Sequence, residues 1–198
     1  RVSICRVHYA LNEAPVWNNG SEMSACAFQR VFHSFSDIDR QYGEIIAGVA
    51  PTRPFLWVAC WTTIDSSRAP EGKHTLIMDT FVPSHLASGE SWDALKEEYT
   101  QEVMLPILRE HTQNMDDNIL AAYYDTGVSL EAANPCFVDG STTGGERTLS
   151  QTGYFRPLPG YSQYKSPLKN LYMTGPSCHP GGGITAMGTI TARVILDE

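Results

Sequence analysis

The chain has 198 residues, of which 42% are hydrophobic and 18% are charged, and its formal net charge at pH 7 is −8. This composition predicts a soluble globular chain with one sizeable core, because aromatic residues, which disordered segments lack, make up 10% of it. The 14 basic residues are never adjacent, which excludes a nucleic-acid partner of the usual kind, since such binding needs clustered Lys and Arg. No run of 18 apolar residues occurs, so we expect no transmembrane segment.

The start of the chain and its cysteines indicate whether it belongs to a larger protein and in which compartment it lies. Residues 2–9 already have the pattern of a strand, so we expect this chain to be part of a larger protein or one subunit of it. The five cysteines are scattered and form no C-x-x-C pair, which favours reduced thiols and a cytoplasmic location. The histidines outside the C-terminal segment show no metal-ligand spacing, so we expect no metal site.

A hairpin is expected in the first half of the chain. Residues 56–61 form a nearly continuous apolar run that is typical of a buried strand, and residues 75–82 form a second strand. Pro70 and Gly72 lie between them and favour a turn, because proline fixes one turn dihedral and glycine permits the other. Together these residues predict an antiparallel pair within a sheet.

A helix is expected after this hairpin. Ser91 is a plausible N-cap, and Asp93 lies in the first turn, where the helix dipole favours a negative charge. Helical spacing is kept by five apolar residues, which are Trp92, Leu95, Tyr99, Val103 and Ile107. Pro106 falls inside this pattern and should kink the helix, because it lacks a backbone donor.

Residues 139–160 have the composition of a loop, with several Gly, Ser and Thr followed by aromatic residues and prolines. A loop of this length inside a compact domain is usually functional or disordered. The aromatic residues and prolines favour an ordered, packed loop.

The last thirty residues predict a strand, a glycine-containing turn and a helix. The strand covers residues 171–174, the turn residues 175–180, and Gly181–Gly183 begin the helix. This order leaves free backbone N–H groups at the positive end of a helix, and the glycines permit close approach by a ligand. A tight strand-to-helix joint without a ligand is the alternative.

This glycine run is not a dinucleotide-binding fingerprint. Residues 181–186 satisfy G-x-G-x-x-A, but the expected strand ends too far upstream and no strand follows the helix to complete a βαβ unit. The acidic ribose partner expected about twenty residues further on is also lacking.

Residues 170–184, which read NLYMTGPSCHPGGGI, resemble the C-terminal FAD-contacting segment of the phytoene desaturase-like flavoproteins. Residues 68–76 resemble the hairpin of that family's substrate domain, and residues 155–157 and 164–170 also resemble the family. The resemblance is strongest over residues 150–198.

The resemblance implies an α+β fold in which residues 1–150 form most of a substrate-binding domain, a β-sheet with helices. Residues 151–198 would then be a C-terminal strand-loop-helix that completes an FAD-binding, Rossmann-type domain. The GxGxxG half of that domain would lie on a separate chain or segment. The implied cofactor-binding residues are Thr174, Gly175, Pro176, His179, Gly182, Gly183, Ile184 and Thr185.

The same resemblance directs the N-terminus of the last helix toward the pyrimidine edge of the flavin. A reduced flavin carries negative charge there, which a helix N-terminus stabilises. The sequence departs from the family after the glycines, because residues 186–192 lack the arginine of the usual Gly-Arg-Asn-Ala-Ala run. Any charged contact from that helix turn is therefore in doubt.

His179 and Arg156 are the candidate catalytic residues. His179 is expected either to hydrogen-bond backbone within its loop or to position the substrate or flavin. Arg156 could pair with a substrate carboxylate, with an FAD phosphate, or with a carboxylate in an ordinary surface salt bridge.

We therefore expect part or a subunit of an FAD-dependent oxidoreductase that transfers hydride from an apolar small-molecule substrate to flavin. The alternative is a non-catalytic binding or scaffold subunit that keeps the fold without the flavin.

Overall fold

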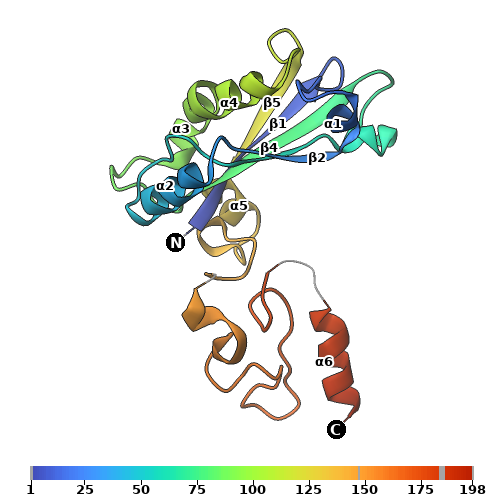
Figure 1. The fold of residues 1–198 in the computed structure, drawn as a ribbon. Helices are drawn as coiled ribbons and strands as arrows, with labels where there is room; N and C mark the ends of the chain where they lie inside the picture. The colour runs from blue at the N-terminus through green and yellow to red at the C-terminus, as the bar shows by residue number, and fades with distance from the viewer. Residues whose placement is uncertain (1, 147, 183–185, 198) are drawn as a thin grey trace. The chain divides into compact units, whose positions relative to one another are not determined.

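The computed structural model describes residues 2–146, 148–182 and 186–197, and the chain divides into two compact units, Arg1–Ser129 and Leu130–Glu198 (Figure 1). This division lies earlier in the chain than the boundary expected between residues 150 and 151. Residues 130–150 belong to the second unit. Within them, the backbone carbonyls of Thr143 and Glu146 accept hydrogen bonds from the Arg156 side chain.

The N-terminal unit contains a five-stranded sheet in the order β2-β3-β4-β1-β5. All four strand pairs are antiparallel. The strands are β1 (Val2–Leu11), β2 (Phe28–Val31), β3 (Leu56–Ala59), β4 (His74–Pro83) and β5 (Ile119–Thr126). The expected strands and their antiparallel pairing through β3 and β4 are confirmed, and the mixture of this sheet with helices makes the fold α+β.

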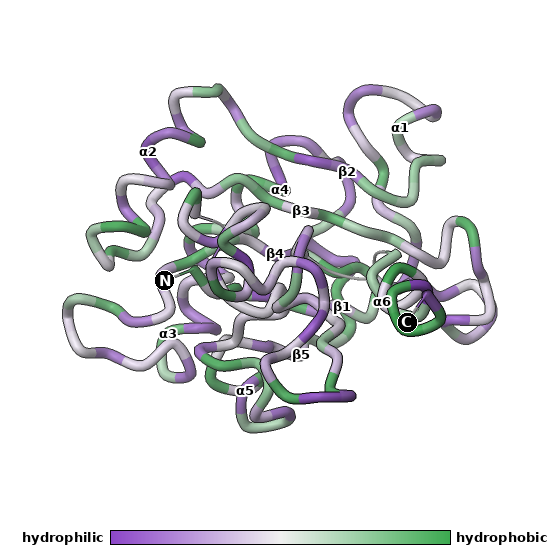
Figure 2. Tube along the Cα trace, turned by 90° about the horizontal axis from the view of Figure 1, so that it is seen from below, coloured by the Kyte–Doolittle hydropathy of each residue, from purple (hydrophilic) through white to green (hydrophobic). Residues whose placement is uncertain are grey.

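Helices pack on one face of this sheet. The helices of the N-terminal unit are α1 (Ser21–Ala25), α2 (Phe35–Ile46), α3 (Trp92–Tyr99) and α4 (Leu105–His111), with short 3-10 turns at Trp61–Thr63 and Ser66–Arg68. Figure 1 shows α3 and α4 along the sheet. Alternate strand residues such as Val7, Leu76 and Met78 are fully buried in one cluster with Trp92 and Leu108. Figure 2 shows β3 in largely hydrophobic colours, as expected for a strand with a neighbour on each side.

The expected helix over residues 92–107 is present but interrupted. Its N-cap is confirmed, since the Ser91 side chain accepts a hydrogen bond from the backbone N–H of Asp93. A π-helical turn, Thr100–Met104, separates α3 from α4, and Pro106 lies in the first turn of α4. Proline has no N–H for the carbonyl four residues earlier and its ring crowds that carbonyl, which accounts for a wider turn at this point.

A buried glutamine joins α2 to the sheet. The Gln41 amide donates to Oγ1 of Thr80 at 2.9 Å and to the backbone carbonyl of Phe81 at 2.9 Å. Its oxygen accepts from the backbone N–H of Phe55 at 2.8 Å. Because these partners lie on β4 and beside β3, one side chain fixes the helix against two strands.

Replacing Gln41 by Met should lower the free energy of unfolding of the N-terminal unit by about 2–4 kcal/mol, because buried polar groups lose their partners. Gln101→Met is the matched control, since Gln101 is exposed and should change stability by less than about 0.5 kcal/mol. The measurement is denaturant unfolding followed by tryptophan fluorescence, which reports this unit alone because all four tryptophans lie in it. Equal effects of the two substitutions would contradict the assigned role.

The C-terminal unit has little regular structure. The helix α5 (Gly127–Ala133) leads into it, 3-10 turns follow at Val138–Gly140, Leu149–Gln151 and Gly153–Phe155, and α6 (Met187–Leu196) ends it. The strand expected at residues 171–174 is only an isolated bridge between Lys165 and Tyr172. The core of this unit is a small cluster that includes Tyr164, Cys178 and Met187.

One side of α6 is packed against the rest of its unit. Met187 and Thr191 are buried and Val194 packs against the small cluster, whereas Ile195 is 45% exposed. Among the described residues, no helix has the length and apolar character needed to cross a membrane.

Candidate functional site

A buried arginine organises the C-terminal unit. Arg156 is only 2% exposed, although it lies in a loop. Its guanidinium donates to the backbone carbonyls of five residues at 2.7–3.2 Å, which are Thr143, Gly144, Glu146, Gln151 and Pro176. Because these carbonyls belong to three separate stretches of the loop region, one side chain holds the stretches together.

Glycines provide the space for this arrangement. Gly181 has a φ of +86°, and a Cβ there would lie 2.7 Å from Nε of Arg156. Gly144 has a φ of +69°, and a Cβ there would lie 2.6 Å from the backbone nitrogen of Ser177. Both positions therefore need glycine for the backbone conformation and for the close approach. At Gly181 the close approach is made by the chain's own arginine.

The surroundings of Arg156 match neither a ligand pair nor a surface salt bridge, which were the roles expected from the sequence. All three guanidinium nitrogens already donate to carbonyls, and the side chain is buried. These hydrogen bonds from Arg156 agree with the expectation of an ordered, packed loop over residues 139–160.

Replacing Arg156 by Lys should loosen the loop region, because lysine has fewer donors and cannot reach all of the carbonyls. A hydrogen bond from a charged group contributes about 1.5–3 kcal/mol, so protection from amide exchange should fall about tenfold or more in peptides covering residues 141–146 and 176–182. Exchange measured by mass spectrometry tests this, with the exposed Arg193→Lys as the matched control. Unchanged protection in the Arg156 variant would refute the organising role.

Gly181→Ala and Gly175→Ala form a second test. Both glycines have positive φ, +86° and +110°, so both variants carry backbone strain of about 1–3 kcal/mol. Only Gly181 is crowded by Arg156, whereas nothing lies within 4 Å of a Cβ at Gly175. We expect exchange to accelerate more in Gly181→Ala, and equal acceleration in both variants would show that close packing contributes nothing.

The structure brings together several of the sequence-predicted cofactor residues. Thr174, Gly175 and Pro176 lead into the turn that contains His179 and Gly182. The Pro176 carbonyl is held by Arg156, and the space around Gly175 is open. Gly183, Ile184 and Thr185 lie outside the described residues.

His179 has an unsatisfied nitrogen. Its side chain is partly buried, and its Nδ1 is fully buried with no hydrogen-bond partner among the described residues. His179 also lines an open depression of about 560 Å³ with Tyr164, Lys165, Val194 and Asp197. A buried polar atom without a partner is rare in native proteins, so this nitrogen is a candidate for contact with a bound molecule.

Among the described residues, no side chain caps the N-terminus of α6. No side chain accepts a hydrogen bond at its N-cap, Ala186, and the first turn of the described helix carries no acidic residue. Such an end presents free backbone N–H groups and partial positive charge. It is therefore suited to an anionic group on a ligand.

Cys178, beside His179, is not poised as a nucleophile. Burial raises the pKa of the Cys178 thiol above its ordinary value, and the nearby Arg156 guanidinium offsets this only in part. Cys5 is buried as well, and desolvation raises its pKa to about 12. All five cysteines are free thiols.

A second surface lies in the N-terminal unit. The face of the sheet opposite α3 and α4 carries an aromatic cluster of Phe28, Phe55, Trp57 and Phe81, with ring centroids 5.5–6.1 Å from that of Trp57. The Arg30 guanidinium carbon lies 4.6 Å from the Trp57 ring centroid. Alternation of aromatic residues with buried aliphatic ones along β3 and β4 was the available sequence pattern.

Phe28 and Phe81 are about two-fifths exposed, and the indole N–H of Trp57 is buried without a partner among the described residues. Large aromatic side chains left partly open on a sheet face are suited to an apolar molecule or another apolar surface.

Comparison with known proteins gives the relationship of the chain. It is 30% identical over 160 residues to 4,4'-diapophytoene desaturase of Staphylococcus aureus. The aligned region covers 78% of this chain and 30% of that protein. It is 29% identical over 199 residues to one of the subunits of limonene dehydrogenase from Castellaniella defragrans, covering 96% and 36%. It is 27% identical over 163 residues to pyridine nucleotide-disulfide oxidoreductase domain-containing protein 2 of Rattus norvegicus, covering 81% and 28%.

The chain is homologous to the phytoene desaturase-like, FAD-dependent oxidoreductases. The resemblance found in the sequence is thereby confirmed. No protein-family model matches the chain. It spans 28–36% of the length of these curated relatives, so it corresponds to only part of such an oxidoreductase.

Proposed function

We propose that this chain forms the substrate domain and the flavin-completing segment of an FAD-dependent oxidoreductase that oxidises an apolar organic substrate by hydride transfer. The observation that carries the proposal is the homology to oxidoreductases of which this chain spans about a third. The remaining part, with the GxGxxG half of the FAD domain, would come from a further segment or a partner chain. The limonene dehydrogenase relative is itself named as one subunit of its enzyme, which supports a multi-subunit arrangement.

Three features of the C-terminal unit support its proposed contact with FAD. The open space at Gly175, the buried unpartnered Nδ1 of His179 and the uncapped N-terminus of α6 all lie in the segment that resembles the family's flavin site. Thr174, Pro176 and Gly182 would contact the cofactor through the same turn, and Gly183, Ile184 and Thr185 through the stretch ahead of α6. Bound FAD would supply the hydride acceptor.

The residues of this chain would act by binding and orientation. His179 would donate or accept a hydrogen bond through Nδ1, and the free N–H groups of α6 would stabilise negative charge on the cofactor. Arg156 would act as a positioning residue, since it fixes the Pro176 carbonyl and hence the turn that carries His179. Hydride transfer to flavin depends mainly on orientation and on exclusion of water, and we assign no residue of this chain as acceptor of the proton that the oxidised substrate also loses.

The aromatic cluster would form a wall of the substrate site. Its rings offer an apolar surface, and the Arg30 guanidinium lies over the Trp57 ring. An apolar substrate gains from burial against such a surface by about 25 cal/mol per Å².

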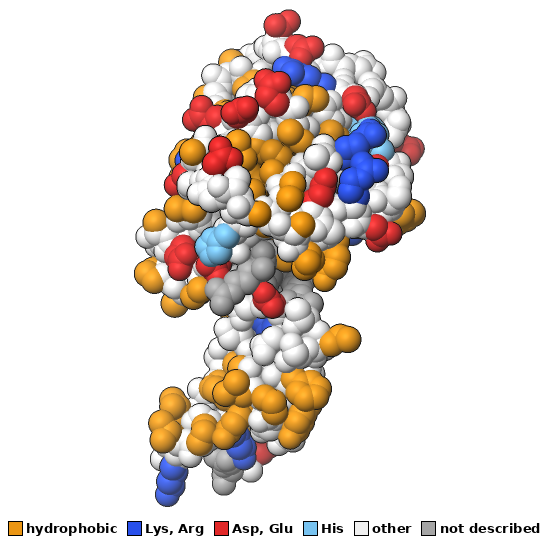
Figure 3. Space-filling view, turned by 90° about the vertical axis from the view of Figure 1, so that its left-hand side faces the viewer, with side chains coloured by type: hydrophobic (Ala, Val, Ile, Leu, Met, Phe, Trp, Pro, Cys, Tyr) orange, Lys and Arg blue, Asp and Glu red, His pale blue; other side chains and the backbone are white. Residues whose placement is uncertain are grey.

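Exposed apolar side chains support the need for further protein around the C-terminal unit. Figure 3 shows hydrophobic side chains gathered on one face of this unit. The large hydrophobic side chains of this unit that are at least 37% exposed include Leu149, Tyr154, Phe155, Leu158, Leu168, Leu171, Ile190 and Leu196. A unit of this size seldom leaves so much apolar surface in contact with water, so the remaining part of an FAD domain is a suitable cover.

The test is to purify the complete protein or complex that contains this chain and to measure flavin absorbance and substrate-dependent reduction. A colourless complex that takes up no added FAD would overturn the enzyme proposal and favour the non-catalytic scaffold. Native mass spectrometry of the same sample identifies the partner chain and the bound cofactor together.

The variants His179→Asn and His179→Gln distinguish which of the two ring nitrogens of His179 contacts the cofactor in that complex. Asparagine places an amide near the position of Nδ1, whereas glutamine places it near Nε2. If Nδ1 contacts the cofactor, the Asn variant should retain FAD and the Gln variant should lose affinity about tenfold, the equivalent of one hydrogen bond of about 1.4 kcal/mol. Equal FAD affinity in both variants and in the unaltered protein would remove His179 from the site.

A further inference from the structure

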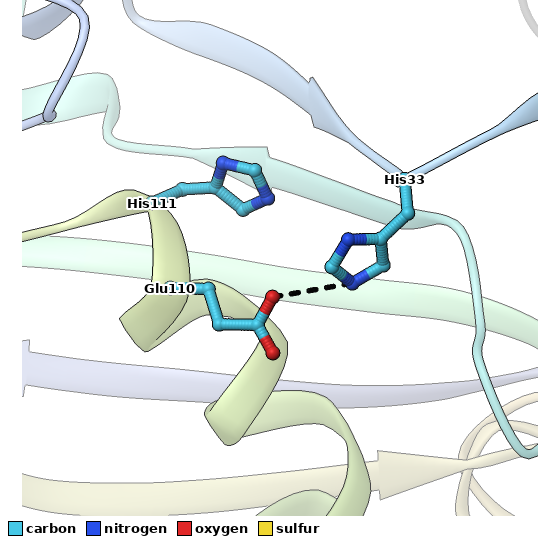
Figure 4. A group of neighbouring side chains, drawn as sticks. All are labelled: His33, Glu110 and His111. Atoms are coloured by element: carbon cyan, nitrogen blue, oxygen red, sulfur yellow. Dashed lines mark ion pairs between the residues drawn. The ribbon is translucent and has the colours of Figure 1, made fainter.

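Three metal-ligating side chains meet at a place that the proposed oxidoreductase function does not use. His33 follows the edge strand β2, and Glu110 and His111 end α4, so residues almost eighty positions apart come together. One ligand atom from each residue lies within 4.8 Å of the others. Figure 4 shows the two imidazole rings and the carboxylate turned toward a common space.

The distances suit a small divalent transition metal. Nε2 of His33 lies 3.4 Å from Oε2 of Glu110. Ligand atoms bound tetrahedrally at about 2.0–2.1 Å from Zn²⁺ are roughly 3.4 Å apart, so this pair already has the required separation. The ring centroids of His33 and His111 are 5.9 Å apart, and the ligand atoms of all three residues lie within 4.8 Å of one another.

The hydrogen bonding of His111 and the types of ligand favour a bound metal over a His33–Glu110 ion pair alone. Nε2 of His111 is buried and has no hydrogen-bond partner among the described residues, although it lies beside a carboxylate and a second imidazole. A simple His33–Glu110 ion pair leaves that nitrogen unsatisfied, whereas a bound metal would use it. Two imidazoles and one carboxylate favour Zn²⁺ and similar ions over Mg²⁺ or Ca²⁺, which prefer oxygen ligands.

The backbone around the cluster is well supported. The His111 carbonyl accepts from the backbone N–H of Asn18, and the Glu110 carbonyl accepts from the Asn18 side chain, both at 2.9 Å. The last turn of α4 is thus fixed, and the exposed His33 and Glu110 side chains are free to adjust.

The geometry points to a Zn²⁺-class site formed by His33, Glu110 and His111, with its fourth position open to water. Such a site would link the end of the edge strand β2 to the C-terminus of α4. The sequence alone did not indicate it, because the spacing of the three residues along the chain follows no metal motif. The site lies within the N-terminal unit and is independent of the proposed flavin site.

Calorimetric titration of the apo-protein with ZnCl₂ tests the site. The protein should carry Cys26→Ser and Cys136→Ser, because these two exposed thiols could bind zinc on their own. We expect one equivalent to bind, and His33→Gln or Glu110→Gln to weaken binding by more than about tenfold, since even outer-shell partners of metal ligands change affinity about 10–100-fold. Absence of saturable binding, or unchanged affinity in both variants, would overturn the proposal.

His8→Gln is the matched control, because Nε2 of His8 pairs with Asp125 at 3.3 Å in a comparable His–carboxylate pair. This variant should bind ZnCl₂ as the parent does, and an equal loss of binding would also contradict the site. A second readout is thermal unfolding followed by tryptophan fluorescence. ZnCl₂ should raise the melting temperature of the parent and of His8→Gln but not of His33→Gln. Absence of that difference would contradict the predicted link between β2 and α4.

Discussion

The buried guanidinium of Arg156 is the interaction on which the C-terminal unit depends. This unit has few helices, no extended strand among its described residues and only a small apolar cluster. Hydrogen bonds from one charged group to five carbonyls therefore take the place of a larger core. Gly144 and Gly181 permit this close packing, so the glycine-rich composition of the region has a structural cause as well as any role in ligand binding.

The N-terminal unit is stabilised by a hydrophobic core rather than by a buried charged group. Its stability rests on one face of an antiparallel sheet that packs against α2, α3 and α4. The other face keeps partly exposed aromatic rings around Trp57. The buried face of the sheet stabilises the fold, and the partly exposed aromatic face can bind an apolar molecule. The proposed substrate domain requires both properties.

These two units give the proposed oxidoreductase complementary parts. The turn that carries His179 and the uncapped start of α6 offer polar contacts, whereas the aromatic cluster offers apolar ones. In the proposed oxidoreductase, of whose relatives this chain spans about a third, the remaining part would cover exposed apolar side chains such as Leu168 and Leu171.

Local sequence patterns determined the strands β3 and β4, the Ser91 cap and the helix α3 that follows it, because periodicity, capping and turn residues act over a few positions. A local family motif likewise determined the relationship to phytoene desaturase-like oxidoreductases. Only the tertiary structure decided that Arg156 is a buried organiser, and only it brought His33 to Glu110. The His33–Glu110 contact joins residues almost eighty positions apart, and Arg156 binds carbonyls up to 20 positions away, and such contacts leave no periodic trace in the sequence.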